Sequence, residues 1–244
     1  MDPVLHLAPA ARADPTLPFR SLLGSLMWIS RCTRPDICFA VTYLSHFCTT
    51  FSQPHFAALK RILRYLFHTR AQTLTLSGLP SPGPVQVRLL TDSDWGQCKN
   101  SRRSVSGNLV TIGTSPVSWQ SKRQHTVALS TCEAEYMAMG DGAKEGLYVV
   151  SFLTQFVKVL RPSPLFYDNR GAGYLASDEI NNHRSKHIDI RFHFIRSWVK
   201  AGIFVLVPVA SADNLSDIFT KQLKLPDFNR LRLAIMSAPP APLL

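Results

Sequence analysis

A connector rich in proline and glycine divides the sequence into two stretches of different character. Residues 77–84 read Ser-Gly-Leu-Pro-Ser-Pro-Gly-Pro, a run in which neither a helix nor a central strand can continue. Before the connector, apolar residues such as Leu59, Leu63 and Leu66 recur at every third or fourth position. This spacing predicts a small helical segment over residues 19–76.

After the connector the pattern becomes that of strands. Residues 85–91, 107–112 and 116–120 are short and rich in β-branched or aromatic side chains, and residues 113–115 suit a turn, so three antiparallel strands are predicted. Elements expected after them are a helix from Ser130 to about Leu160, a strand at 165–167, helices at 169–176 and 188–200, a buried strand at 203–207 and a helix at 214–220.

This order of elements predicts an α/β domain over residues 85–233, a mixed five-stranded sheet with helices packed on it. Ser130 and Glu133 fit a capping box, in which each side chain bonds the backbone N–H of the other residue. Residues 1–18, rich in proline and alanine, are expected to be disordered, and residues 234–244 form a tail.

The charge balance restricts the partners of the chain. Lysine and arginine total 27 against 16 acidic residues, a net charge of +11, which favours a polyanion and nucleic acid first. No apolar run approaches the ~20 residues of a membrane helix, so no membrane partner is expected. The five cysteines form no C-x-x-C pair, which favours free thiols in a reducing compartment, the cytoplasm or the nucleus.

Four acidic residues, Asp92, Glu135, Asp168 and Asp217, lie at the ends of predicted strands or the starts of predicted helices. Such carboxylates gathered in one cleft would repel one another unless cations lay between them, and oxygen ligands suit Mg²⁺ or Mn²⁺. Each acid also has an ordinary structural interpretation, as a turn residue or a helix-dipole partner. Spacing alone does not bring the four together.

Several sequence blocks occur in the order typical of one family. They include Thr91-Asp-Ser-Asp-Trp-Gly96, Val117-Ser-Trp-Gln-Ser-Lys122, Thr126 to Tyr136, Tyr167-Asp-Asn169, Ser185 to Arg196 and Asp217-Ile-Phe-Thr-Lys221. They resemble the ribonuclease H domain of copia-type LTR retrotransposon Pol polyproteins. Residues 19–27, 33–37 and 59–66 are similar to the end of the reverse transcriptase connection segment that precedes that domain.

The resemblance implies a ribonuclease H-like fold and an endoribonuclease that cleaves the RNA strand of RNA–DNA hybrids by two-metal-ion hydrolysis. The family's catalytic and metal-binding acids fall on Asp92, Glu135, Asp168 and Asp217, with two Mg²⁺ ions as cofactors and Mn²⁺ as a substitute. Second choices for these positions are Glu133, Asp94 and Asp189. The implied partners are an RNA–DNA hybrid and the reverse transcriptase part of the same polyprotein.

Residues expected to contact the nucleic acid flank the acids. Basic side chains would neutralise phosphates, and polar ones would reach the 2′-hydroxyls of the RNA strand. Trp95 is considered for stacking on sugars, as is Trp119, for which core packing is the stronger interpretation. The predicted nucleic-acid contacts are Arg102, Arg103, Ser104, Lys122, Arg123, Gln124, Asn169, Lys186 and His187.

Two departures from the family keep other functions open. The chain has no Asp-Asp pair, so the polymerase palm is absent, and glycines at 140 and 142 weaken the long predicted helix. One alternative is a catalytically inactive nucleic-acid-binding remnant, or a domesticated derivative of the element. Another is a purely structural partner that needs the missing polymerase half.

Overall fold

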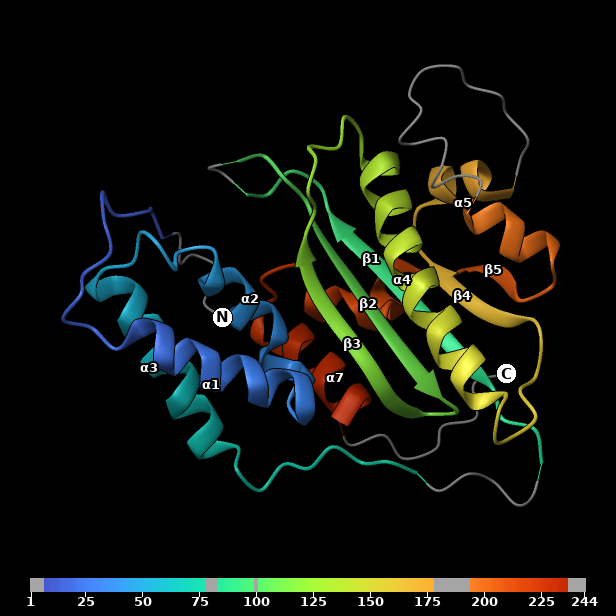
Figure 1. Ribbon diagram of the computed structural model, residues 1–244, viewed down its shortest axis with the longest axis horizontal. Coiled ribbons are helices and arrows are strands. Elements are labelled where there is room, and N and C mark those ends of the chain that lie inside the picture. The colour runs from blue at the N-terminus through green and yellow to red at the C-terminus, as the bar shows by residue number, and fades with distance from the viewer. Residues whose placement is uncertain (1–6, 78–82, 99–100, 178–193, 237–244) are drawn as a thin grey trace. The chain divides into compact units, whose positions relative to one another are not determined.

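The computed structural model describes residues 7–77, 83–98, 101–177 and 194–236 (Figure 1). The chain divides into two compact units, which we call the helical unit (Met1–Thr75 with Lys221–Leu244) and the sheet unit (Leu76–Thr220). Each unit has its own cluster of buried apolar side chains. The boundary lies within two residues of the predicted connector. No helix among the described residues is long and apolar enough to cross a bilayer.

The helical unit is built from short helices around one apolar core. Its elements are α1 (Phe19–Cys32), η1 (Pro35–Ile37), α2 (Cys38–Ser45), α3 (Gln53–His68) and α7 (Leu225–Met236). Pro35 and Pro54 lie in the first turns of η1 and α3, where a proline removes no hydrogen bond. Core residues such as Leu26, Leu44 and Leu59 are completely buried. Helices α1, α2 and α3 and the turn η1 thus lie within residues 19–68 of the predicted helical segment, whereas residues 69–76 are not helical.

Both ends of the chain differ from expectation. Leu7, Ala13 and Leu17 pack against the helical core, and the backbone N–H of Ala10 donates to the Thr50 carbonyl oxygen at 2.8 Å. Residues 7–17 are thus ordered, because their apolar side chains find a surface to cover. Helix α7 belongs to the helical unit, where the Thr75 N–H donates to the Met236 carbonyl oxygen at 3.0 Å. The sheet domain ends at Thr220, earlier than the predicted residue 233.

The sheet unit holds five strands in the order β3-β2-β1-β4-β5. Strands β1, β2 and β3 are antiparallel, whereas β4 runs parallel to β1 and β5 runs parallel to β4. This mixed α/β sheet is the predicted fold class. Its strands are β1 (Val87–Asp94), β2 (Val105–Ile112), β3 (Ser115–Arg123), β4 (Ser163–Tyr167) and β5 (Phe204–Pro208).

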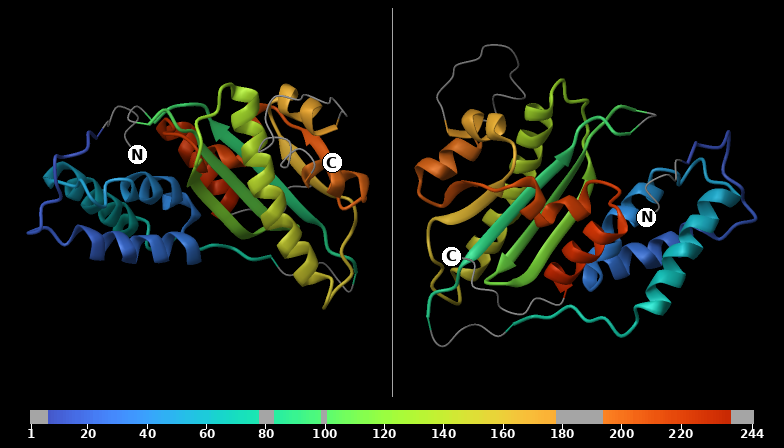
Figure 2. Two further views of the ribbon diagram at one scale, coloured as in Figure 1. Left: turned by 45° about the horizontal axis from the view of Figure 1, so that its top comes forward. Right: turned by 180° about the vertical axis from the view of Figure 1, so that it is seen from behind.

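Three helices cover one face of this sheet. They are α4 (Thr131–Leu153), α5 (Arg170–Ser177) and a helix at residues 194–200, and their apolar side chains share one core with β1, β4 and β5. The 3-10 segments η2 (Ser211–Asp213) and η3 (Leu215–Phe219) follow β5, and η3 packs on β1 and β2 (Figure 2). These elements bring residues from distant parts of the chain to the C-terminal end of β1.

Several predicted elements are corrected in detail. Residues 203–207 were expected to form a buried strand, but β5 lies at the sheet edge and Val205 is 40% exposed. Helix α4 ends at Leu153, before the expected Leu160. The last predicted helix is a 3-10 turn capped by Asn214, whose side-chain oxygen accepts from the Ser216 N–H. Residues 188–193 of another predicted helix lie outside the described residues.

Glycines let α4 lie close to β1. A Cβ on Gly142 would lie 2.4 Å from Thr91 Cγ2, and a Cβ on Gly146 would lie 2.0 Å from Leu89 Cδ2. These distances are too short for any real contact, so the helix could not approach the strand with side chains at these positions. Gly142, which is unfavourable in an isolated helix, is therefore explained by the close packing of α4 on the sheet.

We expect Gly142→Ala to lower the free energy of unfolding by about 1–3 kcal/mol, because the added methyl group forces α4 away from Thr91. Gly140→Ala is the matched control on the same helix, since a Cβ at Gly140 meets nothing within 4 Å. That variant should gain up to about 1 kcal/mol from helix propensity. Urea unfolding of the two variants measures both effects. Equal effects of the two substitutions would contradict the packing explanation.

Candidate metal centre

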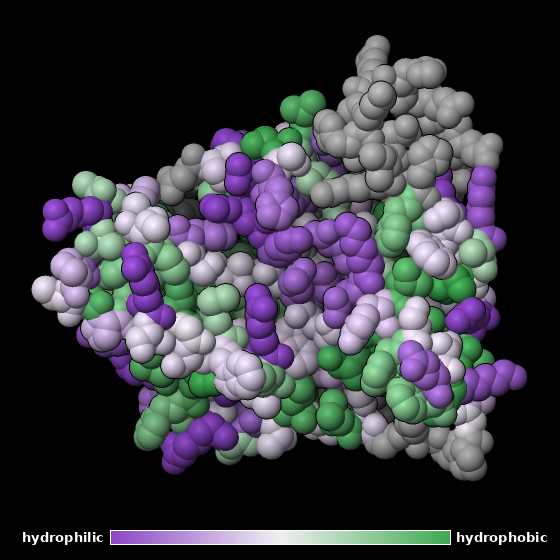
Figure 3. Space-filling model, in the orientation of Figure 1, coloured by the Kyte–Doolittle hydropathy of each residue, from purple (hydrophilic) through white to green (hydrophobic). Residues whose placement is uncertain are grey.

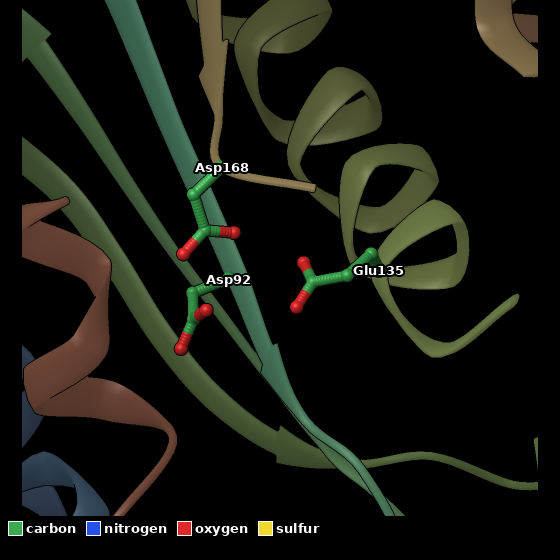
Figure 4. A group of neighbouring side chains, drawn as sticks. All are labelled: Asp92, Glu135 and Asp168. Carbon is green, nitrogen blue, oxygen red and sulfur yellow. The ribbon is translucent and has the colours of Figure 1, made fainter. Parts of the chain in front are cut away.

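Three acidic side chains from separate elements meet at the C-terminal end of β1 (Figure 4). Asp92 lies on β1, Glu135 in the second turn of α4, and Asp168 directly after β4. One carboxylate oxygen from each residue lies within 4.8 Å of one from each of the other two. Asp92 and Glu135 are buried. Three of the four predicted acids are thus close enough to share one cation.

The Glu135 carboxylate is only partly satisfied by hydrogen bonds within this cluster. Its Oε1 accepts the Ser93 N–H at 3.3 Å, while its buried Oε2 has no hydrogen-bond partner among the described residues. Burial, and then the charges of Asp92 and Asp168, raise the pKa of Glu135 to about 9. An orphaned buried carboxylate oxygen and an all-oxygen donor set fit a divalent cation such as Mg²⁺ or Mn²⁺.

With EDTA present, the protein is expected to lose stability as the pH rises from about 5 to 9. Over this window the folded state keeps a proton on Glu135 that the unfolded chain has released, since the pKa rises from 4.5 to about 9 on folding. The free energy of unfolding therefore falls as pH rises, by on the order of a few kcal/mol. Glu135→Gln, which cannot ionise, should flatten this slope and raise the melting temperature at pH 8.

Melting temperatures measured in EDTA between pH 5 and 9 test this prediction. Glu145→Gln is the control, because this glutamate also lies on α4 but is partly exposed and accepts a hydrogen bond from Ser118 at 2.7 Å. It should keep the slope of the wild-type protein. An unchanged slope in Glu135→Gln would show that the carboxylate is already ionised in the folded protein.

Asp217, the fourth predicted acid, is not a member of this cluster. It lies on η3, and its carbonyl oxygen lies 3.1 Å from the Thr220 hydroxyl. The same hydroxyl donates a hydrogen bond to Asp92 Oδ2. The Thr220 hydroxyl thus links the backbone of Asp217 to the carboxylate of Asp92. The four predicted carboxylates were expected to converge, and three of them do.

The approach of η3 depends on a glycine opposite Asp92. Gly107 pairs with Asp92 across β1 and β2, and a Cβ on it would lie 2.7 Å from Thr220 Cγ2. Asn214, fully buried, donates to the Thr91 carbonyl oxygen at 2.9 Å. Thr220 and Asn214 thus fix the backbone and carboxylate of β1 at the cluster. Sequence reasoning missed both, although Thr220 belongs to the Asp217-Ile-Phe-Thr-Lys221 block.

The second-choice acids have other partners. Asp94 is buried and accepts a hydrogen bond from the Val105 N–H, which holds the start of β2. Glu133 Oε2 accepts from the Leu129 N–H at 2.7 Å, while Ser130 Oγ accepts from the Glu133 N–H at 3.1 Å. The predicted helix cap is therefore correct for Ser130, but the Glu133 side chain bonds Leu129 instead. Asp189 lies outside the described residues.

The predicted nucleic-acid contacts separate into surface and buried groups. Arg102 is exposed, and Arg103, Lys122 and Arg123 are partly exposed. Figure 3 shows hydrophilic side chains gathered in the middle of the view, over the strands and the start of α4. Part of this charge is already paired, since Lys122 Nζ lies 3.5 Å from Asp141 Oδ2.

Two of the predicted contacts are corrected. Ser104 is fully buried and accepts the Gly96 N–H at 3.0 Å. Gln124 is 4% exposed and donates to Ser106 and to the Ala134 carbonyl oxygen, both at 2.9 Å. Ser104 thus holds the turn at Gly96, Gln124 links β2 to α4, and both side chains are buried within the domain. Asn169 caps α5 by accepting the Ala172 N–H, and Lys186 and His187 lie outside the described residues.

Comparison with known proteins finds no matching family model but several relatives. The retrovirus-related Pol polyprotein from transposon RE1 of Arabidopsis thaliana is 36% identical over 231 residues, 93% of this chain and 15% of that polyprotein. Secreted RxLR effector protein 161 of Plasmopara viticola is 39% identical over 133 residues, 54% of this chain and 92% of that protein. The solved structure of LC11-RNase H1 from compost has a TM-score of 0.42 at 14% identity, covering 55% of this chain and 92% of that one.

The sheet order, its mixture of antiparallel and parallel strands, and the acids on β1, on α4 and after β4 define a ribonuclease H-like domain. The homologues of this chain are copia-type retrovirus-related Pol polyproteins, which match 84% to 93% of its length at 33% to 36% identity. The chain spans about 15% of the length of the Pol polyproteins that it matches. The family predicted from the sequence blocks is confirmed.

Proposed function

We propose that this chain is an endoribonuclease that cleaves the RNA strand of RNA–DNA hybrids by metal-assisted phosphodiester hydrolysis. The observation that carries the proposal is the cluster of Asp92, Glu135 and Asp168, whose carboxylate oxygens lie within 4.8 Å of one another. Such a cluster is unfavourable unless a cation binds it, and divalent cations bound to carboxylates are the usual means of activating phosphodiesters. The relatives, which are Pol polyproteins, support this choice.

Each acid has a defined part in the proposal. Asp92, Glu135 and Asp168 would hold Mg²⁺ or Mn²⁺, and Asp217, beside Asp92 through Thr220, would complete the set for a second ion. When bound, the ions supply an activated water and charge stabilisation for the leaving 3′ oxygen. The Thr220 hydroxyl donates to Asp92 Oδ2 and thereby orients this carboxylate within the cluster. Asp94 and Glu133 have structural roles.

Basic side chains around the cluster would bind the hybrid. Arg102, Arg103, Lys122 and Arg123 would neutralise phosphates, which gives an affinity that falls with salt and depends little on base sequence. Lys186 and His187 remain proposed contacts from the family resemblance. The reverse transcriptase part of a longer polyprotein is the proposed protein partner.

A metal titration on the full chain tests the proposed function. A hybrid with its RNA strand end-labelled is incubated with Mg²⁺, Mn²⁺ or EDTA, and the products are resolved by length. We expect internal cleavage of the RNA strand with either ion and none with EDTA. The same RNA in single-stranded form, and a DNA duplex of the same sequence, should stay intact.

A second candidate function follows from the position of Asp217. Because this residue is outside the three-carboxylate cluster, the chain could bind a hybrid without completing a two-ion site. A protein that shifts hybrids in a gel yet never cuts them with Mg²⁺ or Mn²⁺ would be the inactive nucleic-acid binder. Such a result would overturn the nuclease proposal.

A further inference from the structure

An exposed tryptophan lies beside the carboxylate cluster. Trp95 directly follows Asp94, the last residue of β1, and its side chain is 49% exposed. Its indole N–H donates to the Ala128 carbonyl oxygen at 3.1 Å, which fixes one edge of the ring. An aromatic ring held in place with about half its surface open to solvent is ready to contact a ligand at little cost in side-chain entropy.

A guanidinium group lies next to Gly96, the residue that follows Trp95. Arg102 is exposed, and a Cβ built on Gly96 would lie 3.7 Å from Arg102 Nη2. Gly96 is the neighbour of Trp95 in the chain and has a φ of 61°, which favours glycine. Arg102 itself has a φ of 54°, and its N–H donates to the Cys98 carbonyl oxygen at 2.6 Å. The guanidinium of Arg102 therefore lies beside the chain neighbour of Trp95.

Trp95 has exposed apolar residues beside its hydrogen-bond partner and the acidic cluster close to it along the chain. Val127 and Leu129 flank Ala128 and are 47% and 86% exposed. Ser93 lies two residues before Trp95 in the chain, and its N–H donates to Glu135 Oε1. Trp95 thus follows the end of the strand that carries Asp92, and we call this position the rim of the acidic cluster.

We propose that Trp95 and Arg102 form a nucleotide-binding subsite at this rim. A nucleotide of a bound strand would place its base or sugar on the ring of Trp95 and its phosphate on Arg102. A flat or apolar group beside an anion is the chemistry that a nucleotide offers, and aromatic side chains with arginines are the usual receptors for it. That the ligand is a nucleic acid rests on the proposed function and is supported by the net charge of +11, which favours a polyanion.

Binding without cleavage tests the subsite. The dissociation constant of a fluorescent RNA–DNA hybrid is measured by anisotropy with EDTA present, for the full chain and its variants. Trp95→Ala should weaken binding roughly five- to a hundredfold, the range that stacking on one base provides. Arg102→Ala should weaken binding as well and reduce the slope of affinity against salt by about one phosphate contact.

Two controls match these variants in the same unit. Tyr148→Ala removes an aromatic ring that is 68% exposed on α4, roughly 20 Å along the helix from Glu135. Lys158→Ala removes one exposed positive charge. Tyr148→Ala should change the dissociation constant less than twofold. Lys158→Ala should have a smaller effect than Arg102→Ala at every salt concentration.

The outcomes separate the subsite from the nuclease. If Trp95→Ala binds as tightly as wild type, or no more weakly than Tyr148→Ala, the subsite is overturned even in a protein that cleaves hybrids. If the wild-type protein never cleaves, the proposed function fails while the binding result still decides the subsite. Should Trp95→Ala lower the melting temperature strongly, Trp95→Leu keeps an apolar side chain without an aromatic face, and its binding decides instead.

Discussion

Asp92→Asn is expected to abolish cleavage of the RNA strand of a hybrid in Mg²⁺. Asp92 lies at the centre of the candidate site, where its carboxylate is close to those of Glu135 and Asp168 and is held by Thr220. An amide keeps the shape and accepts the Thr220 hydrogen bond but lacks the charge that binds a cation. Losing one preorganised electrostatic group costs about a hundred- to a thousandfold in rate, and we expect the upper end of this range or more.

The measurement is single-turnover cleavage of a labelled hybrid at saturating protein. Hybrid binding should stay equal to wild type or become tighter, because a negative charge is removed from the surface that faces phosphates. Asp213→Asn is the matched control, since this aspartate is exposed on η2 and lies outside the cluster. Undiminished cutting by Asp92→Asn would refute the nuclease proposal.

The strands and the long helix could be predicted because their signals are local. Alternation in residues 85–91 and the Ser130 cap need no partner from elsewhere in the chain, and both are present in the structure. The three acids that meet were found through the family resemblance, since spacing alone left each with an ordinary structural interpretation. Asp92 and Asp168 follow from strand ends, which lie together because β1 and β4 are parallel.

The remaining parts depend on contacts that no local pattern contains. The hydrogen bond between Thr220 and Asp92 spans 128 residues, and that between Asn214 and Thr91 spans 123. The helical pattern alone indicates that Gly142 destabilises the helix. In the structure, Gly142 is needed because any side chain at this position would collide with Thr91 on β1. Likewise, an apolar run at 203–207 does not reveal whether the strand lies at the centre or at the edge of the sheet.

A second large effect concerns a buried ion pair in the helical unit. Arg34 and Asp36 are 7% and 5% exposed, and the guanidinium donates to both carboxylate oxygens, at 2.9 and 2.7 Å. The Tyr65 hydroxyl donates to Asp36 Oδ2 at 2.5 Å, and Arg34 Nη2 donates to the Thr69 hydroxyl at 2.7 Å. One carboxylate therefore joins η1 to the end of α3.

Asp36→Asn is expected to lower the free energy of unfolding of the helical unit by about 3–5 kcal/mol, because it leaves the Arg34 charge buried without a counter-ion. Asp14→Asn is the control, since this carboxylate is partly exposed and accepts hydrogen bonds from the N–H and the hydroxyl of Thr16, and it should cost less than about 1 kcal/mol. Urea unfolding followed by circular dichroism measures both.

The double variant Arg34→Met, Asp36→Leu separates the charge from the packing. Replacing both members of a buried pair by apolar side chains of similar size removes the unpaired charge, so much of the stability lost in Asp36→Asn should return. The return is incomplete, because in the double variant the Tyr65 hydroxyl loses its acceptor while its burial, which raises the pKa of Tyr65 to about 12, remains. If the double variant is less stable than Asp36→Asn, the ion pair contributes more than it costs to bury, and the desolvation argument fails for this site.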